Sequence, residues 1–469
     1  MKKEKVTFAL FFGNRGFFPG ELIAGARKEM IQVLEENGYG YIVIDESLTR
    51  YGAVETLAEG KLYAQFLEDN KGKYDGIILS LPNFGDENGA SVAFKDVNVP
   101  ILVQAFPDDL ELMDFAHRRD ALCGKLAMCN VLRQLKIKYT LTKEFTVNPL
   151  SESFIKDLDG FAAVCRVVRG MKQFNIGAFG ARTTAFKTVR VDEISLANKR
   201  INVETIDLSN VFMRMDALQL TDPKLIAKMS HMETISDFSK YTPEKLINIS
   251  KLAVVIDDFI EELELDAVAI RCWDELQKRY QIAPCVILSD LNEKGICAAC
   301  ELDVSNAIMM KALNHAANYP VMLLDVNNNY QSCKNKCFLF HCGPVPAALL
   351  EQPKGHIEEH LMFKKSYGAG SGVGLNCGII ATNEVTVASA KTENGKVCGF
   401  VFDGKFTDDE IPTGFFGCGK VLEKENMNEV LQYMAMNGYR HHVAITKGQY
   451  AEAASEALNK YLEYNVDIL

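Results

Sequence analysis

The chain has 469 residues, of which 48% are hydrophobic and 24% charged, and its formal net charge is −11. This length predicts two or three domains, and the average composition excludes disordered, collagenous and coiled-coil proteins. The acidic balance argues against a broad nucleic-acid surface or an attraction to anionic lipid, and it favours a small-molecule partner.

The cysteines and the amino-terminal segment indicate a cytoplasmic protein. Thirteen cysteines, an odd number in a long chain, are typical of free thiols in a reducing compartment. The charged start and the apolar run Val6–Phe12 imitate a signal peptide, but Gly13-Asn14-Arg15 follows without a small-residue cleavage site. We therefore expect an opening buried strand and no membrane span.

Residues 1–148 alternate short apolar runs with amphipathic stretches. The apolar runs are Val6–Phe12, Tyr41–Asp45, Tyr74–Leu81 and Val99–Phe106, and the helical patterns are Pro19–Asn37 and Ala53–Glu68. This βαβ rhythm predicts a Rossmann-like domain with a parallel, doubly wound sheet.

A second Rossmann-like domain is predicted over residues 149–352. It begins with a helical stretch at 151–170 and continues with strand-like segments at 174–179, 202–208, 267–270, 285–288, 321–325 and 337–341. Helical patterns separate most of these segments, as in another parallel sheet.

Residues 353–469 have a different pattern. Strand-like stretches at Asn376–Thr382, Val385–Ala390 and Lys396–Phe402 lie close together without intervening helices, and a closing helix is predicted at Tyr450–Tyr464. We expect a smaller antiparallel, barrel-like β domain here. The predicted fold is thus α/β, with two Rossmann-like domains followed by a β-rich domain.

Polar residues suited to chemistry are concentrated between Cys297 and Gly343. Glu301 is predicted to open a helix, and Asp325 and His341 each stand at the carboxyl end of an apolar strand. Because ligands of open parallel sheets bind at that edge, we expect these three side chains to converge on one crevice. Two carboxylates and an imidazole suit Mn²⁺ or Mg²⁺, and they suit zinc less well.

Each of these residues also has an ordinary structural interpretation. An acidic residue at a helix start favours the helix dipole, and an Asp after a strand often caps a helix. The pair His441-His442 offers further imidazoles, and the residues alone do not decide which of the two would face a metal. Cys297 and Cys300 lack a second pair at zinc-ribbon spacing, so we interpret them as buried thiols. His360 has no patterned partner and is interpreted as an ordinary surface or core residue.

Several of these residues occur in motifs that resemble the L-fucose/L-arabinose isomerase family. The motifs are Cys300-Glu301-Leu302-Asp303-Val304, Asp325 after a strand, His341-Cys342-Gly343, His441-His442, Asn14-Arg15-Gly16-Phe17-Phe18-Pro19 and Arg118-Arg119-Asp120. The resemblance covers essentially the whole chain, in the same order of three domains.

The resemblance implies an aldose–ketose isomerase with a divalent metal, usually Mn²⁺, held by Glu301, Asp325 and His442. The two carboxylates are implied to double as the acid/base pair that moves a proton between C1 and C2 of an open-chain sugar through a cis-enediolate. His341 would hydrogen-bond a substrate hydroxyl or ring oxygen. A non-catalytic, sugar-binding regulator on the same scaffold is the alternative.

Relatives of this family are implied to accept L-fucose, arabinose or anionic sugars such as sulfoquinovose. Arg15, Arg440 and His441 are further candidates for substrate binding, because an arginine fork suits a tetrahedral oxyanion. The resemblance also implies a homotrimer or homohexamer whose active sites are shared between subunits.

Overall fold

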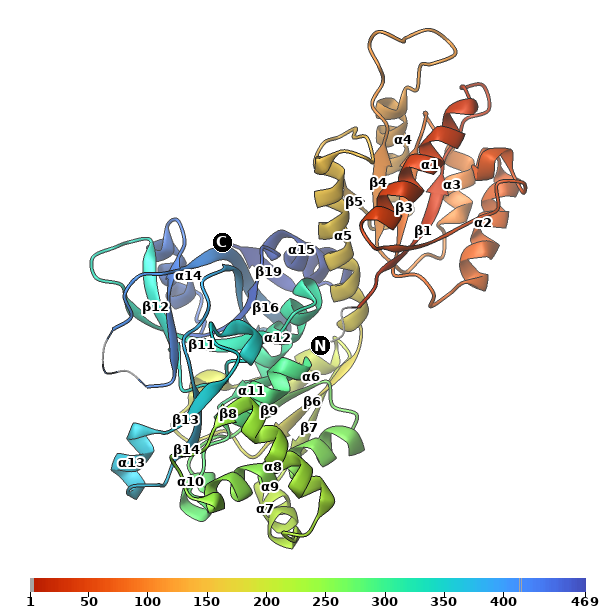
Figure 1. The fold of residues 1–469 in the computed structure, drawn as a ribbon. Coiled ribbons are helices and arrows are strands. Elements are labelled where there is room, and N and C mark those ends of the chain that lie inside the picture. The colour runs from red at the N-terminus through yellow and green to blue at the C-terminus, as the bar shows by residue number, and fades with distance from the viewer. Residues whose placement is uncertain (1–3, 413, 415) are drawn as a thin grey trace. The chain divides into compact units, whose positions relative to one another are not determined.

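The computed structural model describes residues 4–412, 414 and 416–469, and the chain divides into two compact units, Lys3–Arg169 and Gly170–Leu469 (Figure 1). The domain boundaries that we predict after residues 148 and 352 stay predictions. Within the described residues, every helix is too short or too polar to span a lipid bilayer.

The unit Lys3–Arg169 is built on a five-stranded parallel sheet in the order β2-β1-β3-β4-β5. Its strands are β1 (Thr7–Phe12), β2 (Gly40–Val43), β3 (Gly76–Leu81), β4 (Ile101–Ala105) and β5 (Thr140–Leu141). Its helices are α1 (Glu21–Glu36), the 3-10 turn Arg50–Gly52, α2 (Leu57–Asp69), α3 (Glu87–Ala93), α4 (Ala121–Gln134) and α5 (Glu152–Gly170). This strand order is that of a doubly wound fold, and it confirms the parallel α/β sheet predicted from the alternating runs.

The packing of strand β1 explains why its residues Phe8–Phe12 are all apolar. The Phe11 ring lies 5.0 Å from the Tyr63 ring of α2, whereas the Phe8 ring lies 5.6 Å from the Phe161 ring of α5. Phe8 and Phe11 are both fully buried. Because successive side chains of a strand point to opposite faces, a strand covered by helices on both faces must be apolar throughout.

The unit Gly170–Leu469 contains a four-stranded parallel sheet in the order β10-β9-β6-β7. Its strands are β6 (Phe174–Phe179), β7 (Ile201–Ile206), β9 (Ala267–Ile270) and β10 (Cys297–Cys300). The helices in this part of the chain are the 3-10 turn Lys187–Val189, α6 (Glu193–Ala197), α7 (Leu208–Ala217), α8 (Pro223–Ile235), α9 (Pro243–Glu262), α10 (Glu275–Tyr280), α11 (Cys285–Lys294) and α12 (Val304–Ala317). A second parallel α/β layer is therefore present, as predicted.

The same unit contains a seven-stranded sheet in the order β15-β18-β11-β12-β17-β16-β19. Its strands are β11 (Val321–Asn329), β12 (Lys336–His341), β15 (Glu384–Glu393), β16 (Lys396–Thr407), β17 (Cys418–Glu423), β18 (His442–Lys447) and β19 (Asn465–Ile468). Every neighbouring pair is antiparallel except β16 and β19. Strand β16 also pairs with β15, so the predicted antiparallel sheet is present, and its barrel-like closure stays a prediction.

Smaller elements complete this unit (Figure 1). A three-stranded sheet in the order β14-β13-β8 is formed by β8 (Ser236–Asp237), β13 (Gly355–Glu359) and β14 (Val373–Cys377). The remaining helices are the 3-10 turn Ala347–Leu349, α13 (Leu361–Tyr367), α14 (Met427–Met436), α15 (Ala451–Glu456) and the π-helical turn Ala457–Tyr461.

Three details of the predicted fold are wrong. Residues 285–288, predicted as a strand, begin helix α11, because a short apolar run does not separate helix from strand. Strands β11 and β12 pair antiparallel rather than joining the parallel sheet, since residues 330–335 between them are too few for a parallel crossover. The helix predicted over 450–464 forms as α15 and the π-helical turn Ala457–Tyr461, but β19 follows it, so this helix does not close the chain.

Candidate active site

Glu301 lies in the turn between β10 and α12. Glu301 and Leu302 both have left-handed backbone conformations, with φ values of 60° and 62°. Asp303, rather than Glu301, caps the helix, because its carboxylate accepts a hydrogen bond from the Asn306 backbone N–H at 3.1 Å. Two consecutive left-handed residues redirect the chain sharply, so this turn brings both acidic side chains to one neighbour, His442.

His442 is the first residue of β18, and it is fully buried. Its Nε2 atom lies 2.8 Å from Glu301 Oε2 and 3.4 Å from Asp325 Oδ1. Asp325 is directly opposite His442 in the antiparallel pair of β11 and β18. The register of these two strands therefore brings together residues that are far apart in the sequence.

Asp303 is a buried carboxylate with several partners. Its Oδ2 lies 2.9 Å from His442 Nδ1, and its Oδ1 lies 3.0 Å from Arg440 Nη1. Burial alone would raise the pKa of Asp303, but Arg440 and His442 outweigh burial and lower this pKa to about 2. Arg440 is 5% exposed and also donates to the carbonyls of Thr188 and Ala390. Its guanidinium thus supports Asp303, and its binding to substrate stays a prediction.

His341 ends β12, and His441 immediately precedes β18. The Nε2 atoms of both rings lie 3.9 Å from Asp325 Oδ1. His341 Nδ1 accepts a hydrogen bond from the Cys342 backbone N–H at 2.8 Å, so the neutral ring carries its proton on Nε2. The His441 side chain is 45% exposed, whereas His442 is enclosed.

The cluster contains buried atoms that lack an ordinary partner. Among the residues that the structure describes, Asp325 Oδ1, His341 Nε2 and His442 Nε2 have no hydrogen-bond partner, although buried polar atoms normally have one. His442 Nε2 and Glu301 Oε2 are 2.8 Å apart, which is an ion-pair distance, but their relative orientation is not that of a hydrogen bond.

These donor atoms fit a divalent cation. Ligand atoms within 4.8 Å of one another form three groups among the described residues. Two of them share His442, namely Glu301, His441 and His442, and Asp325, His341 and His442, and the third is Cys300, His341 and Cys342. Carboxylate oxygens and imidazole nitrogens are a donor set suited to Mn²⁺ and related ions.

The two carboxylates have different electrostatic surroundings. Burial raises the pKa of Asp325 above its usual range, against the opposing effect of the nearby histidines. Burial acts in the same direction on Glu301, but His442 outweighs it and the pKa of Glu301 is lowered. Trp273 Nε1 donates a hydrogen bond to the other Glu301 oxygen at 3.2 Å. For His442, burial favours the neutral ring, but Asp303 and Glu301 outweigh burial and raise its pKa to about 10.

A cavity of about 320 Å³ opens beside Glu301. It is lined by Cys272, Trp273, Ala283, Pro284, Cys285, Glu301, Cys342, His360, Met362, Phe363, Ser366 and Tyr367. A mainly apolar cavity with a few polar groups beside a carboxylate is the usual form of a small-molecule site. His360, which we interpret from the sequence as an ordinary residue, is part of its wall.

Arg15 belongs to the other unit, Lys3–Arg169, and follows β1. Its Nε donates to the Gly85 carbonyl at 3.0 Å, and its Nη2 lies 3.3 Å from Glu87 Oε2. The guanidinium also lies 4.0 Å from the centre of the Phe84 ring. These contacts fix Arg15 beyond the carboxyl end of β1, and its binding to substrate stays a prediction.

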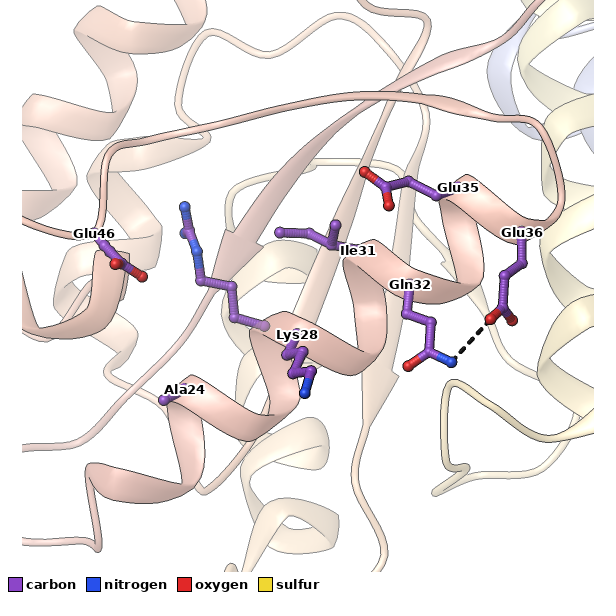
Figure 2. Close-up of a pocket in the computed structure, with 8 residues that line it drawn as sticks. Ala24, Lys28, Ile31, Gln32, Glu35, Glu36 and Glu46 are labelled. Atoms are coloured by element: carbon purple, nitrogen blue, oxygen red, sulfur yellow. Dashed lines mark hydrogen bonds between the residues drawn. The ribbon is translucent and has the colours of Figure 1, made fainter.

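The unit Lys3–Arg169 also has an open hollow of about 470 Å³ along α1 (Figure 2). Figure 2 shows Lys28, Glu35 and Glu36 on this helix, and all three are exposed to solvent. Solvent screens such charges, whereas the unpartnered polar atoms around His442 are buried. We therefore place the candidate active site at the cavity beside Glu301.

Asp303 and Trp273 are neighbours of the site, and the sequence patterns predict no role for either of them. Asp303 has the position of a helix N-cap, and this ordinary role conceals its contact with His442. The sequence signal that could have indicated this contact is that Asp303 lies two residues after Glu301 in the same motif. Trp273 is the single tryptophan of the chain and belongs to none of the motifs.

Two protein-family models match the chain. The model described as fucose/sulfoquinovose isomerase, N-terminal domain, matches residues 9–172, and the model described as L-fucose isomerase, C-terminal domain, matches residues 339–469. Together they cover more than half of the chain. They give no support to the sugar-binding regulator.

Two relatives of similar length agree with these matches. The sulfoquinovose isomerase of Priestia aryabhattai is 24% identical over 390 residues, which are 82% of this chain and 84% of the relative. The sulfoquinovose isomerase of Alkalicoccus urumqiensis is 24% identical over 403 residues, which are 81% of this chain and 83% of the relative. The chain therefore belongs to the fucose/sulfoquinovose isomerase family and is an aldose–ketose isomerase.

Proposed function

We propose that this protein interconverts an open-chain sugar aldose and its ketose with Glu301 and Asp325 as the acid/base pair. Glu301, Asp325 and His442 are proposed to hold a divalent cation. The observation that carries the proposal is the convergence of two carboxylates on the buried Nε2 of His442, at 2.8 and 3.4 Å. This arrangement serves both proton transfer and cation binding, and an ordinary protein core has no need of it.

The cation is proposed to be Mn²⁺, with Mg²⁺ or another divalent ion as the alternative. When bound, such an ion polarises the sugar oxygens on C1 and C2 and stabilises the negative charge of the enediolate. His442 is oriented for this role, because its Nδ1 is engaged by Asp303 and its Nε2 is directed at the two carboxylates. His441, which is more exposed, is proposed to contact substrate instead.

Isomerisation moves one proton between C1 and C2. A carboxylate of the pair removes the proton from one carbon and returns it to the other, while its partner handles the hydroxyl proton. His341 is proposed to donate a hydrogen bond from Nε2 to a substrate oxygen, because its Nδ1 already accepts the Cys342 N–H.

The substrate is proposed to be a deoxy-sugar, a pentose or a sulfo-sugar, of which L-fucose, arabinose and sulfoquinovose are the examples to test. The relatives' names favour sulfoquinovose. The lining of the cavity beside Glu301 contains neither Lys nor Arg among the described residues, which favours an uncharged deoxy-sugar or pentose within this single chain. A charged group contributed to the pocket from elsewhere would reverse that preference.

The test is a panel of sugars offered to the purified protein with added Mn²⁺. Nuclear magnetic resonance detects ketose formation from L-fucose, L-arabinose, D-arabinose and sulfoquinovose, with the Glu301→Gln protein as the control. We expect one of these aldoses to be converted by the wild-type protein alone. A folded, Mn²⁺-loaded protein that converts none of them, or equal conversion by the Glu301→Gln protein, would contradict the proposal.

Assembly and location are further proposals that rest on the family resemblance and on composition. We propose a homotrimer or homohexamer with shared active sites, in the cytoplasm. Light scattering of the purified protein measures the number of subunits, and a monomer that retains full activity would contradict shared sites.

A further inference from the structure

The cavity beside Glu301 has a wall of cysteine side chains. Cys272, Cys285 and Cys342 line the cavity, and the Cys300 sulfur lies within 4.8 Å of the Cys342 sulfur. All four are free cysteines. The Cys285 and Cys342 sulfur atoms are 3.5 Å apart, so these two thiols are in direct contact.

The two thiols of this pair differ in accessibility. Cys285 is 2% exposed, whereas Cys342 is partly exposed, and both border the cavity. His341 Nδ1 lies 3.2 Å from the Cys342 sulfur, so that thiol also has a polar neighbour. A small oxidant entering the cavity therefore meets Cys342 first and finds a second thiol directly behind it.

We propose that Cys342 and Cys285 form a thiol modification site at which a hydroperoxide produces a reversible disulfide that switches the isomerase off. Formation of the disulfide does not depend on the isomerase reaction. The effect of the disulfide on turnover rests on the proposed function. Cys342 is the attacking residue, and Cys285 is the resolving residue.

The chemistry takes two steps. The Cys342 thiolate attacks one peroxide oxygen, the O–O bond breaks, and the departing oxygen leaves as hydroxide, or as alkoxide from an organic hydroperoxide, so that Cys342 becomes a sulfenic acid. The Cys285 sulfur then attacks the Cys342 sulfur, the S–S bond forms, and the sulfenic hydroxyl leaves as water with the remaining thiol proton. With hydrogen peroxide, two thiols lose two electrons and two protons, and the peroxide is reduced to two water molecules.

The disulfide would disturb the candidate active site through His341. A disulfide requires the sulfurs to be about 2.05 Å apart, so the Cys342 side chain must move toward Cys285. The Cys342 backbone N–H is hydrogen-bonded to His341 Nδ1, and His341 Nε2 faces Asp325 at 3.9 Å. Because a displacement of about 1 Å in a catalytic constellation can cost 100-fold in rate, we expect at least a tenfold loss of activity.

The experiment treats the purified full-length protein with hydrogen peroxide and maps its thiols by mass spectrometry of non-reduced peptides. We expect a peptide linked through Cys285 and Cys342, the loss of two thiols, and a loss of isomerase activity that dithiothreitol reverses. In the Cys285→Ser protein, dimedone should trap a sulfenic acid at Cys342, and no linked peptide should form. Cys297→Ala is the control, because Cys297 on β10 is as deeply buried as Cys285. The Cys297→Ala protein should form the Cys285–Cys342 disulfide as the wild type does.

The readouts separate the two proposals. Oxidation of the exposed Cys123 and Cys333 without any linked Cys285–Cys342 peptide would overturn the modification site, whatever the enzyme's activity. A linked peptide with unchanged turnover would overturn the switch. A linked peptide in a protein that converts no sugar would contradict the proposed function and leave the modification site standing.

Discussion

Asp303 Oδ2 lies 2.9 Å from His442 Nδ1, at the ring nitrogen that does not face Glu301. This contact fixes the orientation of the imidazole and leaves Nε2 for the two carboxylates. Arg440 holds Asp303 in turn, at 3.0 Å. The geometry of the site therefore depends on two buried residues that are not themselves proposed to hold the cation.

Replacing Asp303 by Asn should impair the site without removing any proposed ligand. The amide retains the shape of the side chain but loses the negative charge that orients His442, and such losses typically cost 10- to 100-fold in metal affinity or activity. Mn²⁺ titration and steady-state kinetics measure the two effects. Asp192→Asn, at the N-cap of α6, is a matched control and should leave both values unchanged. Unaltered Mn²⁺ affinity in Asp303→Asn, with only a lower melting temperature, would indicate a purely structural role.

The Glu301→Gln and Asp325→Asn proteins should fold but lose isomerisation. General acid–base catalysis contributes on the order of 10²–10⁴ in rate, and weakened cation binding adds to the deficit. Turnover is measured by ketose formation, and the fold by circular dichroism and thermal unfolding. A variant with wild-type turnover and a lowered melting temperature would show that its carboxylate has only a structural role.

Removal of metal should abolish activity, and Mn²⁺ should restore it. Glu301, Asp325 and His442 offer a cation two carboxylates and one imidazole, and the reaction needs an electrophile for the enediolate oxygen. The measurement combines turnover after treatment with a chelator, turnover after back-titration with Mn²⁺ or Mg²⁺, and the metal content of the protein. Full turnover in excess chelator, with no metal detected in the protein, is the result that would contradict the cation.

Lys125 should make the stability of the unit Lys3–Arg169 depend on alkaline pH. It is buried and donates to Thr142 Oγ1 at 2.7 Å and to the Phe145 carbonyl at 2.8 Å, and burial lowers its pKa from 10.5 to about 8. The folded state therefore disfavours the charged amine, and the penalty is complete below about pH 8. As the pH rises from about 8 to 10.5, the unfolded chain binds more protons, so stability should increase by at most about 1.4 kcal/mol per pH unit.

Urea unfolding across this pH range tests the contribution of Lys125. The difference between the wild-type protein and Lys125→Met isolates the titration of this one group, because both proteins share all other titrating residues. We expect the wild type to gain stability relative to the variant as the pH rises. A difference that does not change with pH would show that Lys125 titrates as a solvated lysine.

The first unit could be predicted closely because each of its main strands and helices has its own pattern in a short stretch of sequence. Buried strands such as β1 and β3 are mainly apolar runs that helical patterns separate, and both end where the predicted runs end, at Phe12 and Leu81. The errors arose where one segment's structure depends on a distant partner. Strand β11 has the apolar pattern of a parallel strand, but it pairs with β12 and β18 in an antiparallel sheet.

The convergence of Glu301, Asp325 and His341 was expected, but on different structural grounds. The residue patterns predict all three at one edge of a parallel sheet, whereas Asp325 lies within an antiparallel strand opposite His442. Such a register is set by tertiary packing, so the residue patterns could not distinguish His441 from His442. The contact of Cys285 with Cys342 was hidden for the same reason, since 57 positions separate the two residues.

The left-handed turn at Glu301 and Leu302 also limits how this protein can change during evolution. Within four consecutive positions, the Cys300 sulfur lies within 4.8 Å of the Cys342 sulfur, Glu301 faces His442 Nε2, and Asp303 faces His442 Nδ1. Most loops tolerate inserted or deleted residues, because their side chains have no fixed directions to keep. Here a single insertion or deletion would change the direction of all three side chains at once, so homologues that retain this site should keep the length of this turn even where its residue types diverge.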